Sequence, residues 1–178
     1  MAGPEEPTSV SPEKSQADGA SESASGKSER SAGRHRYSAS VVWNGAGDGC
    51  GTARLTQGSV SFAVGGAKSL GGCGVGANPE EMLDAAIGAC FVNTWAIFLK
   101  KLKISYGEPS VRVSSHVEPD PAGGYRLAGA TVHARVPATL LAGNRAAVEK
   151  TLSLAEKYCI ISRAVRGNVP MNIEIEEV

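Results

Sequence analysis

Residues 77–103, ANPEEMLDAAIGACFVNTWAIFLKKLK, constrain the fold most, because they predict one long helix with a defined start. Asn78 can accept from the free backbone N–H groups of a helix start, and Pro79 suits the first helical position because it has no N–H to satisfy. Glu80 places negative charge at the positive end of the helix dipole. We therefore predict a helix from Pro79 to about Lys101.

Large apolar residues fall on every side of this predicted helix, which is typical of a helix that is buried all round. A membrane span needs about 20 mostly apolar residues with few or no charges, and Asp84, Asn93 and Thr94 interrupt this run. We expect a central core helix and no membrane. Cys90 lies in its middle, a position that fits either a small core residue or a reactive thiol.

The totals exclude several classes of function. Lys plus Arg equals Asp plus Glu, at 18 each, and no basic, aromatic-rich stripe is present, so we expect no nucleic-acid partner. Cys50, Cys73, Cys90 and Cys159 include no CxxC pair, and with three scattered histidines they predict no metal site. No apolar signal sequence precedes the domain, so we expect a reducing cytoplasm. There a cysteine pair is expected to cycle between its thiol and disulfide forms rather than to form a permanent structural disulfide.

The first part of the chain divides into a tail and the start of a domain. Residues 1–36 are rich in Ser, Gly, Pro and charge, with almost no large apolar side chains, and are expected to form a disordered tail. Residues 37–178 are expected to form the domain. It opens with strands over residues 37–43 and 51–64, the latter turning at Gln57-Gly58 into a hairpin or meander.

The second half predicts a hairpin, a helix and a last strand. Alternating residues predict strands over 110–117 and 125–136, joined by a Pro- and Gly-containing turn. Asn144 is a plausible cap for a helix to about Tyr158, with Cys159 next on its inner face. Residues 171–176 alternate as a strand with one solvated side.

The glycine-rich segment over residues 65–77 invites a dinucleotide-binding interpretation through Gly72, Gly74 and Gly76. That motif places its glycines in a short turn straight after a strand, whereas here about ten loop residues intervene and Asn78-Pro79 begins the helix. A flexible wall around a site fits the segment better, and we expect no cofactor.

Several motifs together resemble the OsmC/Ohr family of thiol peroxidases over about residues 37–178. The most specific are Asn78-Pro79-Glu80 ten residues before Ala-Cys90-Phe, and Cys159 near the end of a later helix. The resemblance implies an α+β, OsmC-like fold, with antiparallel sheets packed around a buried central helix in an intertwined homodimer.

The resemblance also implies a function, the cysteine-based reduction of organic or lipid hydroperoxides. Cys90 would be the peroxidatic cysteine and Cys159 the resolving one, since a thiolate that attacks a peroxide leaves a sulfenic acid that a second thiol can condense with. An external dithiol or a lipoylated protein would then restore both thiols. Cys50 and Cys73 lie in Gly-rich loops and match no cysteine of the family, so a neutral interpretation is favoured over an auxiliary thiol role.

This sequence departs from the family's pattern at the cationic residue that assists the reactive cysteine. The family's peroxidases place an arginine against the reactive cysteine, held by a glutamate that matches Glu80, but Gly47 stands at the Ohr-type position. Either Lys68 or Arg54 substitutes, or the thiol is a poor peroxidase, because a buried mid-helix thiol without a cation has a raised pKa. The apolar wall expected around Cys90 consists of Ala86, Ile87, Phe91 and Trp95.

Glu80 and Cys90 lie ten residues apart, a rise of ~15 Å along a helix, so Glu80 cannot touch Cys90 of its own chain. A catalytic Glu80 would need a second subunit with its helix packed antiparallel, and the alternative is that Glu80 serves only the helix dipole. The main rival function is a non-enzymatic relative, a thiol-bearing dimer that senses oxidation or holds an apolar ligand.

Overall fold

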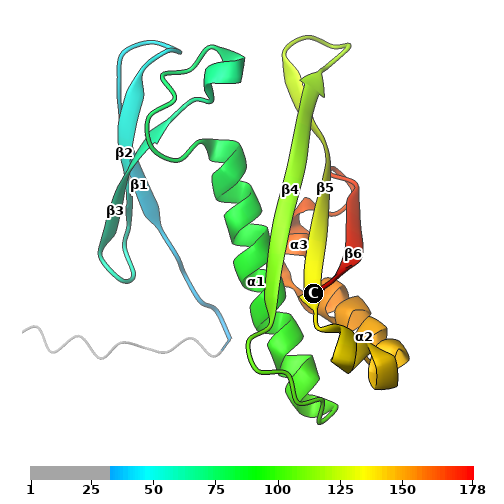
Figure 1. The fold of residues 1–178 in the computed structure, drawn as a ribbon. Helices are drawn as coiled ribbons and strands as arrows, with labels where there is room; N and C mark the ends of the chain where they lie inside the picture. The colour runs from blue at the N-terminus through cyan, green and yellow to red at the C-terminus, as the bar shows by residue number, and fades with distance from the viewer. Residues whose placement is uncertain (1–32) are drawn as a thin grey trace, which may run out of the picture. The chain divides into compact units, whose positions relative to one another are not determined.

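The computed structural model describes residues 33–178 (Figure 1). Most of the expected tail, residues 1–36, lies outside the described residues. The elements run in the order β1 (Ala39–Asn44), β2 (Cys50–Leu55), β3 (Val60–Gly65), η1 (Lys68–Leu70), α1 (Pro79–Lys101), β4 (Ser110–Pro119), β5 (Tyr125–Val136), α2 (Ala138–Tyr158), α3 (Ile160–Val165) and β6 (Met171–Glu177).

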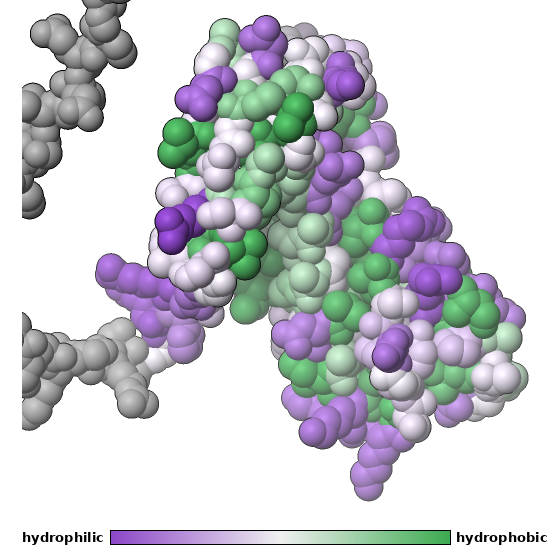
Figure 2. Space-filling model, turned by 60° about the vertical axis from the view of Figure 1, so that its left-hand side comes forward, coloured by the Kyte–Doolittle hydropathy of each residue, from purple (hydrophilic) through white to green (hydrophobic). Residues whose placement is uncertain are grey.

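The first sheet is an antiparallel meander of β1, β2 and β3, as predicted. The ladder pairs Ala39 with Leu55 and Cys50 with Gly65, so the three strands are in register over their whole length. Several large apolar side chains of this region remain exposed, namely Tyr37, Val41, Val42, Trp43, Leu55 and Val60. Figure 2 shows apolar residues gathered in patches between polar ones on the face that it presents.

The second sheet has the order β4-β5-β6. β4 and β5 form the predicted antiparallel hairpin, with a register shift between His116 and Val117. β6 pairs parallel to β5, from Ala130 opposite Met171 onward, so this sheet is mixed rather than wholly antiparallel. The parallel pairing follows from the connection, because α2 and α3 carry the chain back to the start of β5 before β6 begins.

The α1 helix begins as predicted, since the Asn78 side chain accepts a hydrogen bond from the backbone N–H of Glu81 at 2.8 Å. Its buried face follows one stripe, with Ile87, Phe91, Trp95 and Leu99 at spacings of four. The opposite face, which consists of Ala85, Ala86, Ala89, Asn93 and Ile97, is exposed. The expectation of a helix buried all round is therefore wrong for the single chain, because apolar composition on every side does not mean that one chain covers every side.

By length and composition alone α1 would suffice to cross a membrane, a test that core helices of soluble proteins also pass. In this fold its buried stripe packs on α2 and on the β4–β6 sheet. The indole N–H of Trp95 donates to the hydroxyl of Thr151 at 2.8 Å, and that hydroxyl donates to the carbonyl of Val148. The α1–α2 contact is therefore fixed by a buried hydrogen bond as well as by apolar packing.

The α2 helix begins at Ala138, six residues before the predicted cap Asn144, which lies inside the helix. Pro137 has extended backbone angles and leads directly into the first turn, and Leu141 extends the buried face toward the N-terminus. The helix ends at Tyr158, as predicted. Cys159 follows on the inner face, as predicted, because its N–H still donates to the carbonyl of Ala155 at 2.8 Å and its side chain is buried in the same core cluster as Leu152. Its ψ of 120° then ends α2 and leads into the short α3.

Candidate functional site

Two free thiols meet where the middle of α1 passes the junction between α2 and α3. Cys90 is half-buried on α1, and Cys159 is fully buried at the junction. Their side chains lie within hydrogen-bonding distance of each other. The structure therefore brings together the two cysteines that the sequence analysis paired, and both stay thiols rather than a disulfide.

The surroundings of Cys90 favour its thiolate. Burial raises the pKa of the Cys90 thiol, but hydrogen bonds from the Cys159 side chain, from the backbone N–H groups of Ile161 and Ile160, and from Thr94 outweigh this and leave the pKa below its ordinary value. The expectation of a raised pKa for a mid-helix thiol is therefore wrong. It overlooked the first turn of α3, whose backbone N–H groups at Ile160 and Ile161 favour the charged form of Cys90.

The pKa of the Cys159 thiol shifts in the opposite direction, above its ordinary value. Burial and the neighbouring Cys90 sulfur raise the pKa of the Cys159 thiol, against smaller lowering contributions from the hydroxyl and backbone N–H of Ser162. Cys159 Sγ accepts from the Ser162 N–H at 3.4 Å and so caps α3. Of the two thiols, Cys90 is therefore the one whose charged form is favoured, and Cys159 is the one whose protonated form is favoured and can donate to the Cys90 sulfur.

The groups that favour the Cys90 thiolate are hydrogen-bond donors, with no cation among them. Lys68 packs on its own segment, since a Cβ atom at Gly74 would lie 2.3 Å from Lys68 Cγ. Arg54 lies exposed on β2. Gly47 lies in the β1–β2 turn with open space around it. Neither candidate cation therefore takes part in the cysteine site of the single chain.

Glu80 lies in the first turn of α1, away from the cysteine pair of its own chain, as the helix rise predicts. It lines a cavity of about 450 Å³ together with Asp84 and Ser115. Ser115 Oγ donates to Asp84 Oδ2 at 3.0 Å. Buried oxygens of Glu80 and Asp84, Oε2 and Oδ1 respectively, have no hydrogen-bond partner among the described residues. The catalytic role expected of Glu80 stays a prediction.

The expected apolar wall around Cys90 is mostly wrong. Ile87, Phe91 and Trp95 are fully buried and contribute to the core instead of facing a substrate. The apolar groups beside the site come from the other side of the junction, where Ile160 is 73% exposed and Tyr158 is 51% exposed. Sequence reasoning missed Ile160 because α3 was not predicted, and it placed Tyr158 only as the end of α2.

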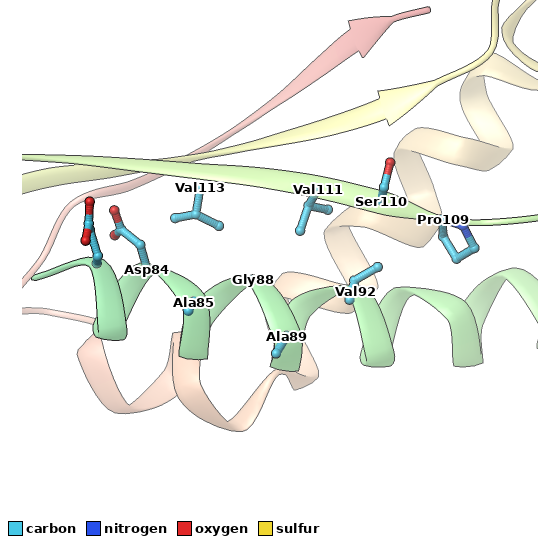
Figure 3. A pocket seen from close by; sticks show the side chains of 10 residues that line it. Asp84, Ala85, Gly88, Ala89, Val92, Pro109, Ser110, Val111 and Val113 are labelled. Atoms are coloured by element: carbon cyan, nitrogen blue, oxygen red, sulfur yellow. The ribbon is translucent and has the colours of Figure 1, made fainter. Parts of the chain in front are cut away.

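A second cavity of about 540 Å³ lies between α1 and β4 (Figure 3). Ala85, Gly88 and Val92 line it from the helix, and Val111 and Val113 line it from the strand. Gly88 allows the close approach of helix and strand, since a Cβ atom there would lie 3.3 Å from Val113 Cγ2. The cavity is mainly apolar in its middle and acidic at the Asp84 end.

The neutral interpretation of the other two cysteines is wrong, because Cys50 and Cys73 form a disulfide. Cys50 is the first residue of β2 rather than a loop residue. The glycines beside Cys73 also have a structural reason, since a Cβ atom at Gly72 would lie 2.2 Å from the carbonyl carbon of Gly66. The glycine spacing thus reflects a tightly folded segment. Within residues 33–178, no cluster of three His, Cys, Asp or Glu side chains could hold a metal ion.

Comparisons with known proteins agree on one family. The sequence model of the OsmC-like protein family matches residues 71–174. Organic hydroperoxide resistance protein-like 1 of Staphylococcus epidermidis is 31% identical over 105 residues, which cover 59% of this chain and 73% of that protein. Organic hydroperoxide resistance protein-like 2 of the same species is 28% identical over 143 residues, which cover 78% and 94%. An organic hydroperoxide resistance protein OsmC from Legionella pneumophila superposes with a TM-score of 0.65 at 25% identity, covering 80% of this chain and 99% of that one.

Proposed function

Because the chain belongs to the OsmC family, we propose that it is a cysteine-dependent peroxidase that reduces organic hydroperoxides. One observation carries the proposal: the Cys90 sulfur lies against the Cys159 thiol and against the backbone N–H groups of Ile160 and Ile161. This arrangement supplies a nucleophilic thiolate, a group to resolve its oxidation product, and donors that stabilise the anion.

The first chemical step is nucleophilic attack. The Cys90 thiolate attacks the distal oxygen of R–O–O–H, the O–O bond breaks, and the alkoxide leaves with a proton as the alcohol. Cys90 becomes a sulfenic acid. Exposed Ile160 and Tyr158 beside the site give it an apolar rim, which suits an alkyl or acyl chain better than hydrogen peroxide.

The second step forms a disulfide. The Cys159 sulfur attacks the sulfenic sulfur of Cys90, an S–S bond forms, and water leaves. Burial keeps Cys159 from reacting with peroxide itself, since its pKa is raised and its side chain is fully covered. An external dithiol or a lipoylated protein then donates two electrons to restore both thiols, in a reducing cytoplasm.

The proposed assembly is a homodimer. The exposed apolar face of α1 and the exposed side chains of β1 and β2 are apolar surface that a single chain leaves uncovered. An antiparallel pairing of two α1 helices would also carry Glu80 of one chain toward the cysteine site of its partner. We include Glu80 in the catalytic site of the dimer on that basis.

The test is stopped-flow consumption of tert-butyl hydroperoxide and of hydrogen peroxide by the reduced protein, with thiols counted before and after. The proposal expects faster reaction with the organic peroxide and the loss of two thiols per molecule of alcohol formed. Gly47 at the arginine position favours the rival function, a non-enzymatic thiol sensor or apolar-ligand binder. That rival expects slow oxidation without turnover when a dithiol is supplied.

A further inference from the structure

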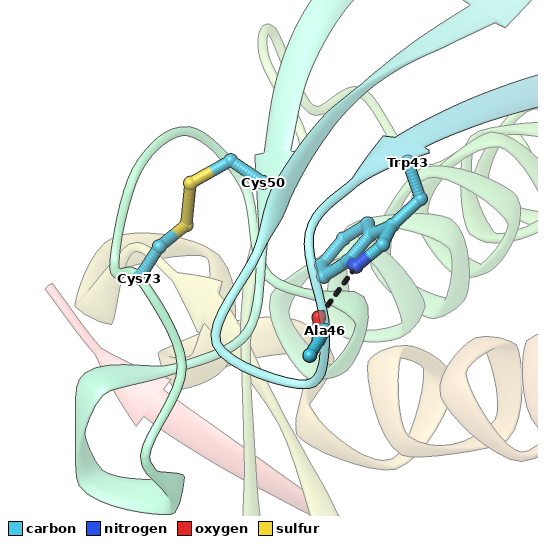
Figure 4. Close-up of a disulfide and its surroundings, with 4 residues drawn as sticks. All are labelled: Trp43, Ala46, Cys50 and Cys73. Carbon is cyan, nitrogen blue, oxygen red and sulfur yellow. Dashed lines mark hydrogen bonds between the residues drawn. A yellow bond between two sulfur atoms is a disulfide. The ribbon is translucent and has the colours of Figure 1, made fainter.

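The disulfide joins Cys50 to Cys73 in the connecting segment between β3 and α1, which we define as residues 66–78 (Figure 4). The Cα atoms of the two cysteines lie 6.1 Å apart, within the usual range for a disulfide. Cys50 pairs with Gly65 in the β2–β3 ladder, and a Cβ atom at Gly65 would lie 2.3 Å from Cys73 Sγ. Cys73 therefore packs onto the end of the strand, in space that only a glycine leaves open.

The end of the connecting segment is anchored to β3, since Ala77 donates to Ala63 and accepts from Gly65 at 3.0 and 3.1 Å. Before Ala77, and apart from the disulfide, the segment is held mainly by its own backbone. The N–H groups of Gly72 and Gly74 donate to carbonyls within the segment at 2.9 and 3.0 Å. Its larger apolar side chains contribute little burial, since Leu70 is 39% exposed and Val75 is 53% exposed. Segments with few buried apolar contacts open locally at low free-energy cost. The disulfide is therefore the main side-chain restraint on this segment.

The segment also forms a wall of the cavity that holds Glu80. Ala67, Ser69 and Leu70 line the cavity from the segment, opposite Asp84 and Ser115. Glu80 lies in the first turn of α1, two residues after the segment ends. The conformation of the segment thus sets the shape of the cavity on one side of the Glu80 carboxylate.

We propose that Cys50 and Cys73 are a reversible redox modification site, distinct from Cys90 and Cys159, whose oxidation fixes the connecting segment and whose reduction releases it. Both cysteines are half-buried, so small oxidants and thiols can reach them. An organic hydroperoxide oxidises one thiol to a sulfenic acid and leaves as the alcohol, and the second thiol condenses with it to release water. A dithiol reverses the reaction by exchange, supplying two electrons and two protons.

The inference rests on the proposed function only for the identity of its oxidant, so the test uses the Cys90→Ser variant of the full chain, which lacks the peroxidatic thiol. Amide hydrogen exchange is measured after oxidation by tert-butyl hydroperoxide and after reduction by dithiothreitol. We expect the disulfide in the oxidised sample by peptide mapping. On reduction, we expect about tenfold faster exchange at Gly72 and Gly74, with no change at the Trp95 amide in the core.

A Cys50→Ala/Cys73→Ala double substitution in the same background is the matched control. It should exchange at the fast rate in both samples, which assigns the effect of dithiothreitol to this pair. Equal exchange at Gly72 and Gly74 in the oxidised and reduced Cys90→Ser protein overturns the proposal. So does a pair that stays reduced with the hydroperoxide, or a disulfide that dithiothreitol does not open in the folded protein. The comparison of oxidised with reduced Cys90→Ser protein already measures the effect of the disulfide on exchange. The test therefore does not depend on the folding of the double variant.

Discussion

The Sγ atom of Cys159 accepts a hydrogen bond from the backbone N–H of Ser162, at an N–S distance of 3.4 Å. This contact makes Cys159 the N-cap of α3 and fixes the first turn of that helix beside Cys90. In the proposed mechanism one residue thus supplies the resolving thiol and also positions the N–H donors that favour the peroxidatic thiolate. In that mechanism backbone donors take over part of the role expected of the family's arginine.

Removing one of those donors tests this account. Ile160→Pro deletes the N–H at the first position of α3, where proline is tolerated, and Cys159 already has the extended ψ of 120° that precedes a proline. Since this N–H favours the charged form of Cys90, we expect its removal to raise the Cys90 pKa. The thiolate then forms at higher pH, so alkylation of Cys90 at neutral pH slows.

Ile160→Ala is the matched control, because it removes the side chain and keeps the N–H. The alkylation rate of Cys90 against pH gives the pKa in each variant. The parent protein should show a midpoint below that of an ordinary thiol, and Ile160→Ala should share it. Equal midpoints for Ile160→Pro and Ile160→Ala would show that this N–H does not stabilise the thiolate.

Replacing each of the two cysteines by serine should impair peroxide reduction in a different way. Cys90→Ser should abolish peroxide turnover. Cys159→Ser keeps a side chain that caps α3 well, so Cys90 should react once and then accumulate as sulfenic and sulfinic acid. Mass spectrometry measures the added oxygens. Equal turnover in the parent and in Cys90→Ser would return Cys90 to a packing role.

Gly47→Arg should raise the rate with organic peroxide. A side chain at position 47 meets open space, and the backbone there is outside the left-handed region, so the substitution itself is tolerated. A cation near a thiol lowers its pKa, each unit being worth ~1.4 kcal/mol. Gly47→Glu is the control of opposite charge, and it should not accelerate the reaction. If Lys68 supplies charge in the assembled protein, Lys68→Ala should slow the parent and Gly47→Arg should partly rescue it. Single-turnover rates that are unmoved by all three substitutions would contradict a role for charge here.

The helix packing behind the site makes a stability prediction. Thr151→Val leaves the buried indole N–H of Trp95 without its acceptor, which should lower the free energy of unfolding by about 1–3 kcal/mol. Thr151→Ser retains the hydroxyl and should lose less. Urea unfolding curves of the three proteins measure the difference. A Thr151→Val protein as stable as Thr151→Ser would mean that the indole finds another partner.

Local signals in the sequence were enough for part of this structure. The start of α1 was predictable because Asn78, Pro79 and Glu81 each act within one turn, and the two hairpins were predictable from alternation between turn residues. Recognition of the family placed Cys90 and Cys159 in one site. The α+β class and the OsmC-like fold are confirmed.

Other features depend on contacts that no local pattern contains. α3 has only six residues and is capped by a cysteine, so neither its periodicity nor its cap was visible in the sequence. The donors to Cys90 were missed with it. The Cys50–Cys73 bond spans 23 residues and depends on the β2–β3 register, which places Gly65 beside Cys50. Because apolar residues lie on every side of α1, the sequence could not show which face of the helix a single chain buries.

The central claim is that Cys90 and Cys159 form one peroxide-reducing pair, and the most direct measurement is peptide mapping after one equivalent of tert-butyl hydroperoxide is added to the fully reduced protein. The account predicts a Cys90–Cys159 disulfide, formed in step with one equivalent of alcohol and absent from Cys90→Ser. Recovery of Cys90 as a free thiol while the alcohol accumulates would contradict it.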